Sequence, residues 1–217
     1  MKIELIPVLD ICYTYQDVTW PAGGDAADKD AYQAACLRRA GFTDLMEPYL
    51  SGTTFYQLVN ISDANLTRWL LDYTRAYREG EYERDNVSPF FGGYVLKVDA
   101  EDKYFPQCCS NLADIRFWNG LADLKILPAE GHPSPAIHIQ DDNIVFEFKD
   151  ENEPFYPLPP DIILTVSRNE LEVALANLQE TLLVFQERIE RINVVENLQL
   201  EKIDELLIWG NKVHADK

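Results

Sequence analysis

Three kinds of residue or segment are scarce in this sequence. The 217 residues include only 4 cysteines, too few for a disulfide-stapled fold of this length. Lys and Arg number 19 against 37 Asp and Glu, which gives a net charge of −18. Nucleic-acid affinity comes largely from Lys and Arg, so this charge argues against DNA or RNA binding. No apolar run approaches the ~20 residues of a membrane-spanning helix.

The N-terminal residues do not have the pattern of a secretory signal. Such a signal needs an uncharged apolar core, and Glu4 and Asp10 interrupt the apolar residues here. We therefore expect a strand over 2–9, a cytoplasmic protein and free thiols. A disulfide between Cys108 and Cys109 is not expected, because the ring that joins adjacent cysteines is strained.

The composition and the apolar pattern predict a globular α+β fold. Apolar residues make up 47% and charged residues 26% of the chain, fractions typical of a folded protein. Alternating and β-branched residues predict a small, mainly antiparallel sheet, and residues 136–139 and 144–149 form a predicted hairpin around Asp141-Asp142-Asn143. Cap residues and apolar spacing predict flanking helices over 25–40 and 62–77.

The C-terminal region has the clearest helical pattern. Four prolines between 154 and 160 break the chain, and Ser167 with Glu170 then forms a capping-box pattern. Apolar residues follow at steps of 4 and 3 through 171–192, and a second helix is expected over 194–209. We predict a C-terminal helical pair, with either an α+β domain over 1–160 and a helical segment over 161–217 packed on it, or one domain over 1–217. The 171–192 helix either packs within the chain, leaving a monomer, or forms a dimer seam.

The chemical motifs of common enzyme classes are missing. The sequence contains no phosphate-binding glycine loop, no Gly-x-Ser-x-Gly and no His-Glu-x-x-His. This absence favours a non-enzymatic protein without a cofactor. The alternative is a small hydrolase or metal-dependent enzyme that uses Cys108, Cys109, His132 and His138, because thiols and imidazoles bind zinc and a Cys–His pair is a nucleophile. Zinc-binding cysteines are usually about two to four residues apart, so adjacent thiols packed in the core are the competing interpretation.

Acidic residues and one tryptophan are the candidates for a protein-binding surface. An acidic face attracts a basic partner and speeds association, although it also occurs simply as a solvated surface. Trp20 precedes Pro21-Ala22-Gly23-Gly24 and is either an exposed anchor or folded back onto the core. The residues proposed for such a surface are Trp20, Asp25, Asp99, Asp102, Asp141, Asp142 and Glu151.

A block around the adjacent cysteines resembles other proteins. The residues from Phe105 to Trp118, which read FPQCCSNLADIRFW, resemble a block in uncharacterised bacterial proteins. Acidic, motif-poor α+β chains of this size also resemble immunity proteins of bacterial toxin systems. This resemblance implies a protein-binding or antitoxin role toward a basic protein partner such as a nuclease toxin, and it identifies no binding residues.

Overall fold

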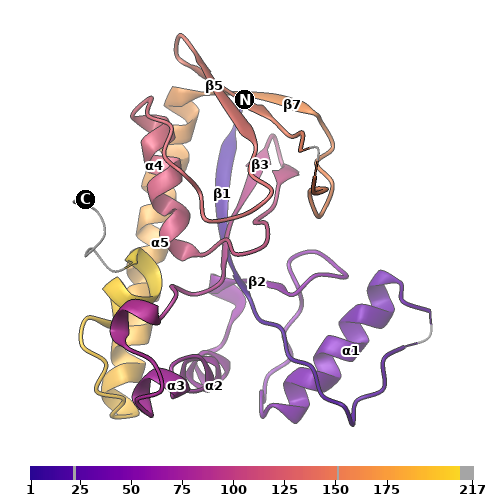
Figure 1. The fold of residues 1–217 in the computed structure, drawn as a ribbon, viewed down its shortest axis with the longest axis vertical. Coiled ribbons are helices and arrows are strands. Elements are labelled where there is room, and N and C mark those ends of the chain that lie inside the picture. Colours follow the sequence, from indigo (N-terminus) through magenta and orange to yellow (C-terminus); the bar gives the residue numbers. More distant parts are fainter. Residues whose placement is uncertain (22, 151, 211–217) are drawn as a thin grey trace. The chain divides into compact units, whose positions relative to one another are not determined.

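A computed structural model describes residues 1–21, 23–150 and 152–210 (Figure 1). The fold is α+β, as the sequence predicts, with two antiparallel sheets. The chain divides into two compact units. The first unit contains Met1–Pro7 and Pro89–Leu183, and the second contains Val8–Ser88 and the residues from Val184 onward. None of the helices within the described residues has the length and apolar character needed to cross a membrane.

The first sheet has four strands in the order β2-β1-β3-β4. Strand β1 (Ile3–Asp10) passes from the first unit into the second, where it pairs with β2 (Phe55–Gln57). In the first unit β3 (Gly92–Val98) pairs antiparallel with β4 (Glu101–Tyr104). The first five residues of β3, Gly92 to Leu96, are all buried. Because successive side chains of a strand point to opposite faces, both faces of β3 are covered.

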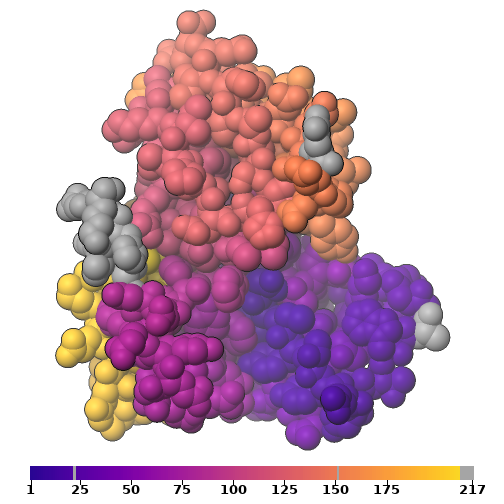
Figure 2. All heavy atoms as spheres, in the orientation of Figure 1, coloured from indigo at the N-terminus to yellow at the C-terminus, as the bar shows by residue number. Residues whose placement is uncertain are grey.

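The second sheet confirms the predicted hairpin. Strand β5 (Ala136–Gln140) pairs with β6 (Asn143–Glu147), and β6 pairs with β7 (Ile163–Ser167). The side chains of Ile144 and Phe146 are fully buried, while their neighbours along β6 are not. This alternation orients one face of the sheet toward the core. In Figure 2 the salmon and orange atoms, which belong to the later residues of the first unit, form most of its visible surface.

The helices of the second unit begin at the predicted caps. Asp25 caps α1 (Ala26–Arg39), because its carboxylate accepts the N–H of Asp28 at 2.8 Å. The Ser62 hydroxyl accepts a backbone N–H of α2 (Asp63–Tyr73) at 3.2 Å. Each cap satisfies a donor that the first helical turn leaves unpaired.

Two predicted segments of the second unit are shorter than expected. The β-branched and aromatic residues over 53–61 favour a strand, but the strand is limited to β2, because the chain turns into a 3-10 helix over Leu58–Asn60. The helix predicted to extend to residue 77 ends at Tyr73, since the Thr74 hydroxyl binds the carbonyl of Leu70 at 2.8 Å. The remaining short helices are α3 (Arg75–Arg78) and a 3-10 turn over Arg84–Asn86.

The C-terminal region contains one long helix rather than a clear helical pair. Helix α5 covers Arg168–Val195, and up to residue 210, where the described residues end, only a short π-helical turn, Glu205–Trp209, follows it. Asn193 accounts for the difference, because its amide donates to the Leu200 carbonyl at 2.9 Å and accepts the Leu200 N–H at 3.1 Å. These bonds hold an irregular loop where the sequence predicts a second helix.

The apolar face of α5 is buried within the chain. All seven side chains of the predicted seam are at most 8% exposed. Packing inside the chain therefore accounts for the 4–3 spacing, which leaves these side chains no free surface for a second copy. They are Leu171, Leu175, Leu178, Leu182, Phe185, Ile189 and Ile192.

Asp10 provides a stability test that depends on pH. Burial raises the pKa of its carboxyl, although the Thr54 hydroxyl donates to it at 2.5 Å and opposes the shift. Folding at neutral pH therefore buries a charge at a cost, and this cost falls as pH decreases through the raised folded-state pKa. We expect Asp10→Asn to raise the free energy of unfolding at pH 7. The gain should vanish below the unfolded-state pKa of about 3.9.

The measurement is denaturant unfolding at several pH values. Asp123→Asn is the control, because the Asp123 side chain is 67% exposed and its replacement should change stability little at any pH. An Asp10→Asn gain that is the same at acid and neutral pH would show that the buried charge is not its cause.

Candidate metal-binding site

The two adjacent cysteines occupy the middle of a tight turn in the first unit. The Gln107 carbonyl accepts the Ser110 N–H at 3.0 Å, and the Gln107 N–H donates to the Ser110 hydroxyl at 3.1 Å. Cys108 and Cys109 are the central residues, and Cys109 has a φ of 68°. Glycine or asparagine usually occupies such a position. A cysteine there costs roughly 1 kcal/mol, and strained residues of this kind gather at functional sites.

This turn places the two thiols side by side on the surface. The Cys108 and Cys109 Sγ atoms are 3.6 Å apart, and both residues are exposed. The interpretation of this pair as core packing is therefore wrong. All four cysteines of the chain are free, as predicted, and only Cys36 is buried.

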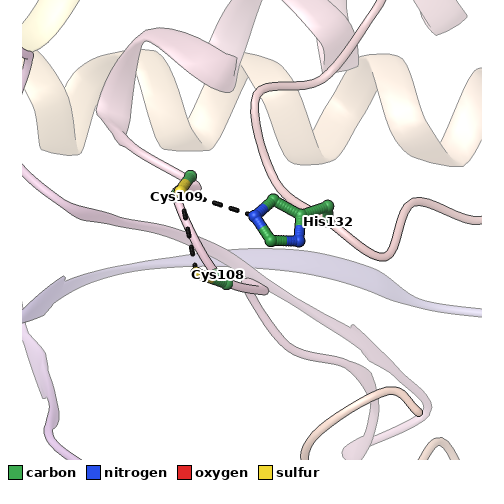
Figure 3. A group of neighbouring side chains, drawn as sticks. All are labelled: Cys108, Cys109 and His132. Carbon is green, nitrogen blue, oxygen red and sulfur yellow. Dashed lines mark hydrogen bonds between the residues drawn. The ribbon is translucent and has the colours of Figure 1, made fainter. Parts of the chain in front are cut away.

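A third ligand residue, His132, reaches the thiols from a distant segment. The His132 N–H donates to the Cys108 carbonyl at 2.9 Å in an isolated β-bridge. Its ring turns toward the thiols, and Nε2 is 3.6 Å from the Cys109 Sγ (Figure 3). The ligand atoms of Cys108, Cys109 and His132 all lie within 4.8 Å of one another.

Two buried contacts set the position of the His132 segment. The carboxylate of Asp114 accepts the N–H of Asn111 at 3.1 Å and that of Glu130 at 2.9 Å. Asp114 therefore connects the residues after Cys109 to those before His132. Its own pKa is raised, mainly by burial, although the two backbone N–H donors oppose the shift.

Gly131 is the second contact. A Cβ atom at this position would overlap the Ser110 hydroxyl. Glycine lets the segment before His132 approach the cysteine turn while the Ser110 hydroxyl keeps its hydrogen bond with the Gln107 N–H.

The second ring nitrogen of His132 contacts a carboxylate. Glu153 Oε2 lies 2.8 Å from His132 Nδ1. The backbone N–H groups of Asn152 and Glu153 both donate to the Asp150 carboxylate, which holds this loop and lowers the pKa of Asp150. A carboxylate on the far nitrogen orients the ring and leaves Nε2 as the ligand atom, the arrangement common in metal sites.

The distances fit a tetrahedral thiolate–imidazole site on two of its edges. With Zn–S and Zn–N bonds of about 2.3 and 2.0 Å, two sulfurs lie about 3.8 Å apart and a sulfur and a nitrogen about 3.6 Å apart. The Cys108–Cys109 and Cys109–His132 distances are both 3.6 Å. The Cys108–His132 edge is at most 4.8 Å and would shorten by roughly 1 Å or less through rotation of exposed side chains.

The thiol of Cys109 is held in its neutral form. Its pKa is raised, first by the hydrogen bond with Cys108, then by desolvation and by the charges of Cys108 and Glu130. A free cysteine nucleophile instead needs a lowered pKa. The raised pKa therefore argues against Cys109 as a free thiolate nucleophile, and a metal ion would bind it with release of the thiol proton.

Glu153 provides a direct test of the orienting carboxylate. We expect Glu153→Gln to weaken Zn²⁺ binding by about 10-fold, because loss of an outer carboxylate typically costs 10- to 100-fold in affinity. Competition with a chromophoric chelator measures this change. Glu147→Gln is the matched control, since Glu147 lies 3.7 Å from His138 on the hairpin. An equal loss in both variants would mean that general surface charge, and not the His132 contact, supports binding.

The remaining predicted ligand, His138, is not part of this group. It lies on β5, and its Nε2 faces Glu147. The sequence places His132 and His138 only six residues apart, but His132 bridges to Cys108 and His138 lies on strand β5, which begins at Ala136. The two rings therefore belong to different local structures, and only His132 meets the cysteines.

The predicted partner-binding residues are divided between the two units. Trp20 and Asp25 lie in the second unit, and the other described members lie in the first. Trp20 is 55% exposed and meets Tyr32 edge-on with ring centroids 4.6 Å apart. Glu151 lies outside the described residues.

Most of the acidic candidates have local structural roles. Asp25 caps α1, and Asp99 accepts the backbone N–H of Lys2 at 2.7 Å. Asp102 pairs with Lys97 at 3.2 Å. Asp141 and Asp142 form the hairpin turn, where Asp141 has a φ of 52°. These contacts explain why the residues are acidic or polar without requiring a partner.

Sequence reasoning missed Glu153 and Asp114. Glu153 is the last residue of an acidic run, which reads as a solvated stretch. The Asp150-x-x-Glu153 spacing was the available signal, because an Asp often accepts backbone N–H groups two and three residues ahead. Asp114 had a similar signal in its spacing from Asn111, which forms a capping box.

Comparison of the chain with protein-family models, with curated proteins and with solved structures finds no match. The assignment of a function therefore depends on the geometry described above, and the resemblance to immunity proteins stays a prediction.

Proposed function

We propose that this chain is a zinc-binding protein whose ion is held by Cys108, Cys109 and His132. The observation that carries the proposal is the spacing of the three ligand atoms, which lie within 4.8 Å of one another and come from one turn and one distant segment. The Glu153 carboxylate on the far nitrogen of His132 adds the expected orienting partner. This is the metal-dependent alternative of the sequence analysis, without His138.

The donor set selects the class of metal ion. Two thiolates and one imidazole favour borderline or soft ions such as Zn²⁺, whereas Mg²⁺ and Ca²⁺ require oxygen ligands. Structural zinc sites usually have four protein ligands, and catalytic sites have three plus water or substrate. The three protein ligands therefore support a site in which one coordination position of the ion stays open.

Elemental analysis tests the proposal directly. Protein purified without a chelator or an affinity metal should contain about one zinc per chain. Thiol titration of the same sample should find Cys108 and Cys109 protected until a chelator is added. A metal-free protein that binds no added Zn²⁺, with both exposed thiols reacting at the rate of a free thiol, would rule out the proposal.

Binding of a basic protein partner is the second candidate function. The net charge of −18 supports it, as does the exposure of the Trp20 ring. An acidic surface of this kind would steer a basic partner such as a nuclease toxin. Charge reversal within the 141–153 segment should slow association with such a partner, and an unchanged association rate would count against this function.

A further inference from the structure

The proposed zinc site has an open side. Among the described residues, the group of possible ligands contains only Cys108, Cys109 and His132, and all three are exposed. Glu153 does not complete the site, because it contacts Nδ1, the ring nitrogen on the far side from the thiols. A zinc ion there would keep a coordination position that a ligand from another molecule reaches directly.

The three ligand residues of the site are all exposed. Substrate sites are typically concave and bury most of the ligand. The cavity behind the cysteine turn has a volume of about 10 Å³, and its lining includes Ser110 and Asp114 but none of the three ligand residues. That space fits no more than a water molecule. The ligands instead face solvent, where side chains of another molecule have access.

Two carboxylates act on the ligand residues, and a third holds the same loop. Glu153 contacts His132, Asp150 holds the same loop, and the charge of Glu130 acts on the Cys109 thiol. These negative charges attract cations and oppose the approach of anionic ligands. The molecule that supplies the fourth ligand therefore has a neutral or basic surface around that ligand.

We propose that the zinc ion is a cargo that this site transfers to a thiol-bearing acceptor on a neutral or basic surface. The inference rests on the proposed zinc-binding function and deepens it. In the first step the acceptor sulfur bonds to the ion at the open position. In each later step one more acceptor–zinc bond forms as one bond to Cys108, Cys109 or His132 breaks. The proton of the first acceptor thiol goes to solvent, and the proton of each later one goes to the departing cysteine or imidazole, so no oxidant or reductant is needed.

The rate law of zinc removal tests the direct attack. Zinc-loaded protein is mixed with 2-mercaptoethanol at increasing concentration, and a chromophoric dye that binds the released ion follows the reaction. The observed rate should rise in proportion to thiol concentration. A rate that does not depend on thiol concentration would show that the ion leaves before the thiol reacts, and would overturn the transfer mechanism.

Charge selectivity tests the kind of acceptor. Cysteamine, 2-mercaptoethanol and mercaptoacetate carry a positive, a neutral and a negative group. Because each thiol is compared with itself at low and high salt, their different thiol pKa values do not affect the result. Salt should slow removal by cysteamine, leave 2-mercaptoethanol unchanged and speed mercaptoacetate. Equal salt dependence for all three thiols would overturn the preference for a basic acceptor.

The Glu130→Gln variant locates this effect. It removes a carboxylate whose charge acts on Cys109 but which is not one of the possible ligands. The difference in salt dependence between cysteamine and mercaptoacetate should shrink in this variant and persist in Asp123→Asn, which changes an exposed carboxylate elsewhere. Absence of bound zinc would refute the proposed function itself, whereas bound zinc with thiol-independent release would refute only the transfer.

Discussion

Replacement of Cys109 by serine should lower the affinity for Zn²⁺ by at least about 100-fold, more than the loss of an outer carboxylate costs. The neutral serine hydroxyl is a poor ligand for zinc compared with a thiolate. Cys109 is the ligand common to both 3.6 Å contacts, one with Cys108 and one with His132. Its loss should therefore affect the site more than the loss of either neighbour. Chelator competition on purified protein measures the change.

Two controls separate this effect from a change in folding. Cys12→Ser removes a thiol that accepts a hydrogen bond from the Gln33 side chain at 3.6 Å and lies outside the ligand group, so zinc affinity should not change. Cys109→Ser should keep the wild-type midpoint of chemical unfolding when both proteins are metal-free, since the exposed side chain contributes little packing. Wild-type affinity in Cys109→Ser would refute the site as described.

Replacement of Gly131 by alanine should give the largest structural effect near the site. The added Cβ would overlap the Ser110 hydroxyl. Both residues are buried, and such overpacking typically costs about 1–3 kcal/mol. Because the Ser110 hydroxyl is held by the Gln107 N–H, we expect the segment to move away from the cysteine turn and to displace His132. We expect a lower free energy of unfolding in denaturant. We also expect at least a 10-fold loss of Zn²⁺ affinity, because affinity depends on the orientation of the His132 ring.

A double-mutant cycle identifies the cause. Ser110→Ala removes the hydroxyl that the new Cβ would meet, at the cost of the hydrogen bond to the Gln107 N–H. The Gly131→Ala loss should therefore be smaller in the Ser110→Ala background than in the wild type. Strictly additive losses would show that the close approach of Gly131 to Ser110 does not set the position of His132.

Local signals explain the parts of the fold that the sequence predicts correctly. Asp25 and Ser62 begin helices because each cap needs only the next few residues. The hairpin around Asp141 follows from alternation and a short polar turn. The predicted second C-terminal helix fails because the Asn193 side chain pairs with the backbone of Leu200, a contact that helical apolar spacing does not indicate.

Charge, periodicity and cysteine count do not depend on contacts between distant residues, so the sequence alone predicts an acidic chain with an α+β fold and free thiols. It also indicates the cysteine and histidine types as candidate ligands. The folded chain is needed to show that His132 and not His138 meets Cys109, and that Glu153 contacts the far nitrogen of the His132 ring. These residues are separated by more than twenty positions along the chain. Their meeting depends on the left-handed conformation of Cys109, the glycine at position 131 and the buried carboxylate of Asp114. The spacing of the ligand residues along the sequence indicates none of these features.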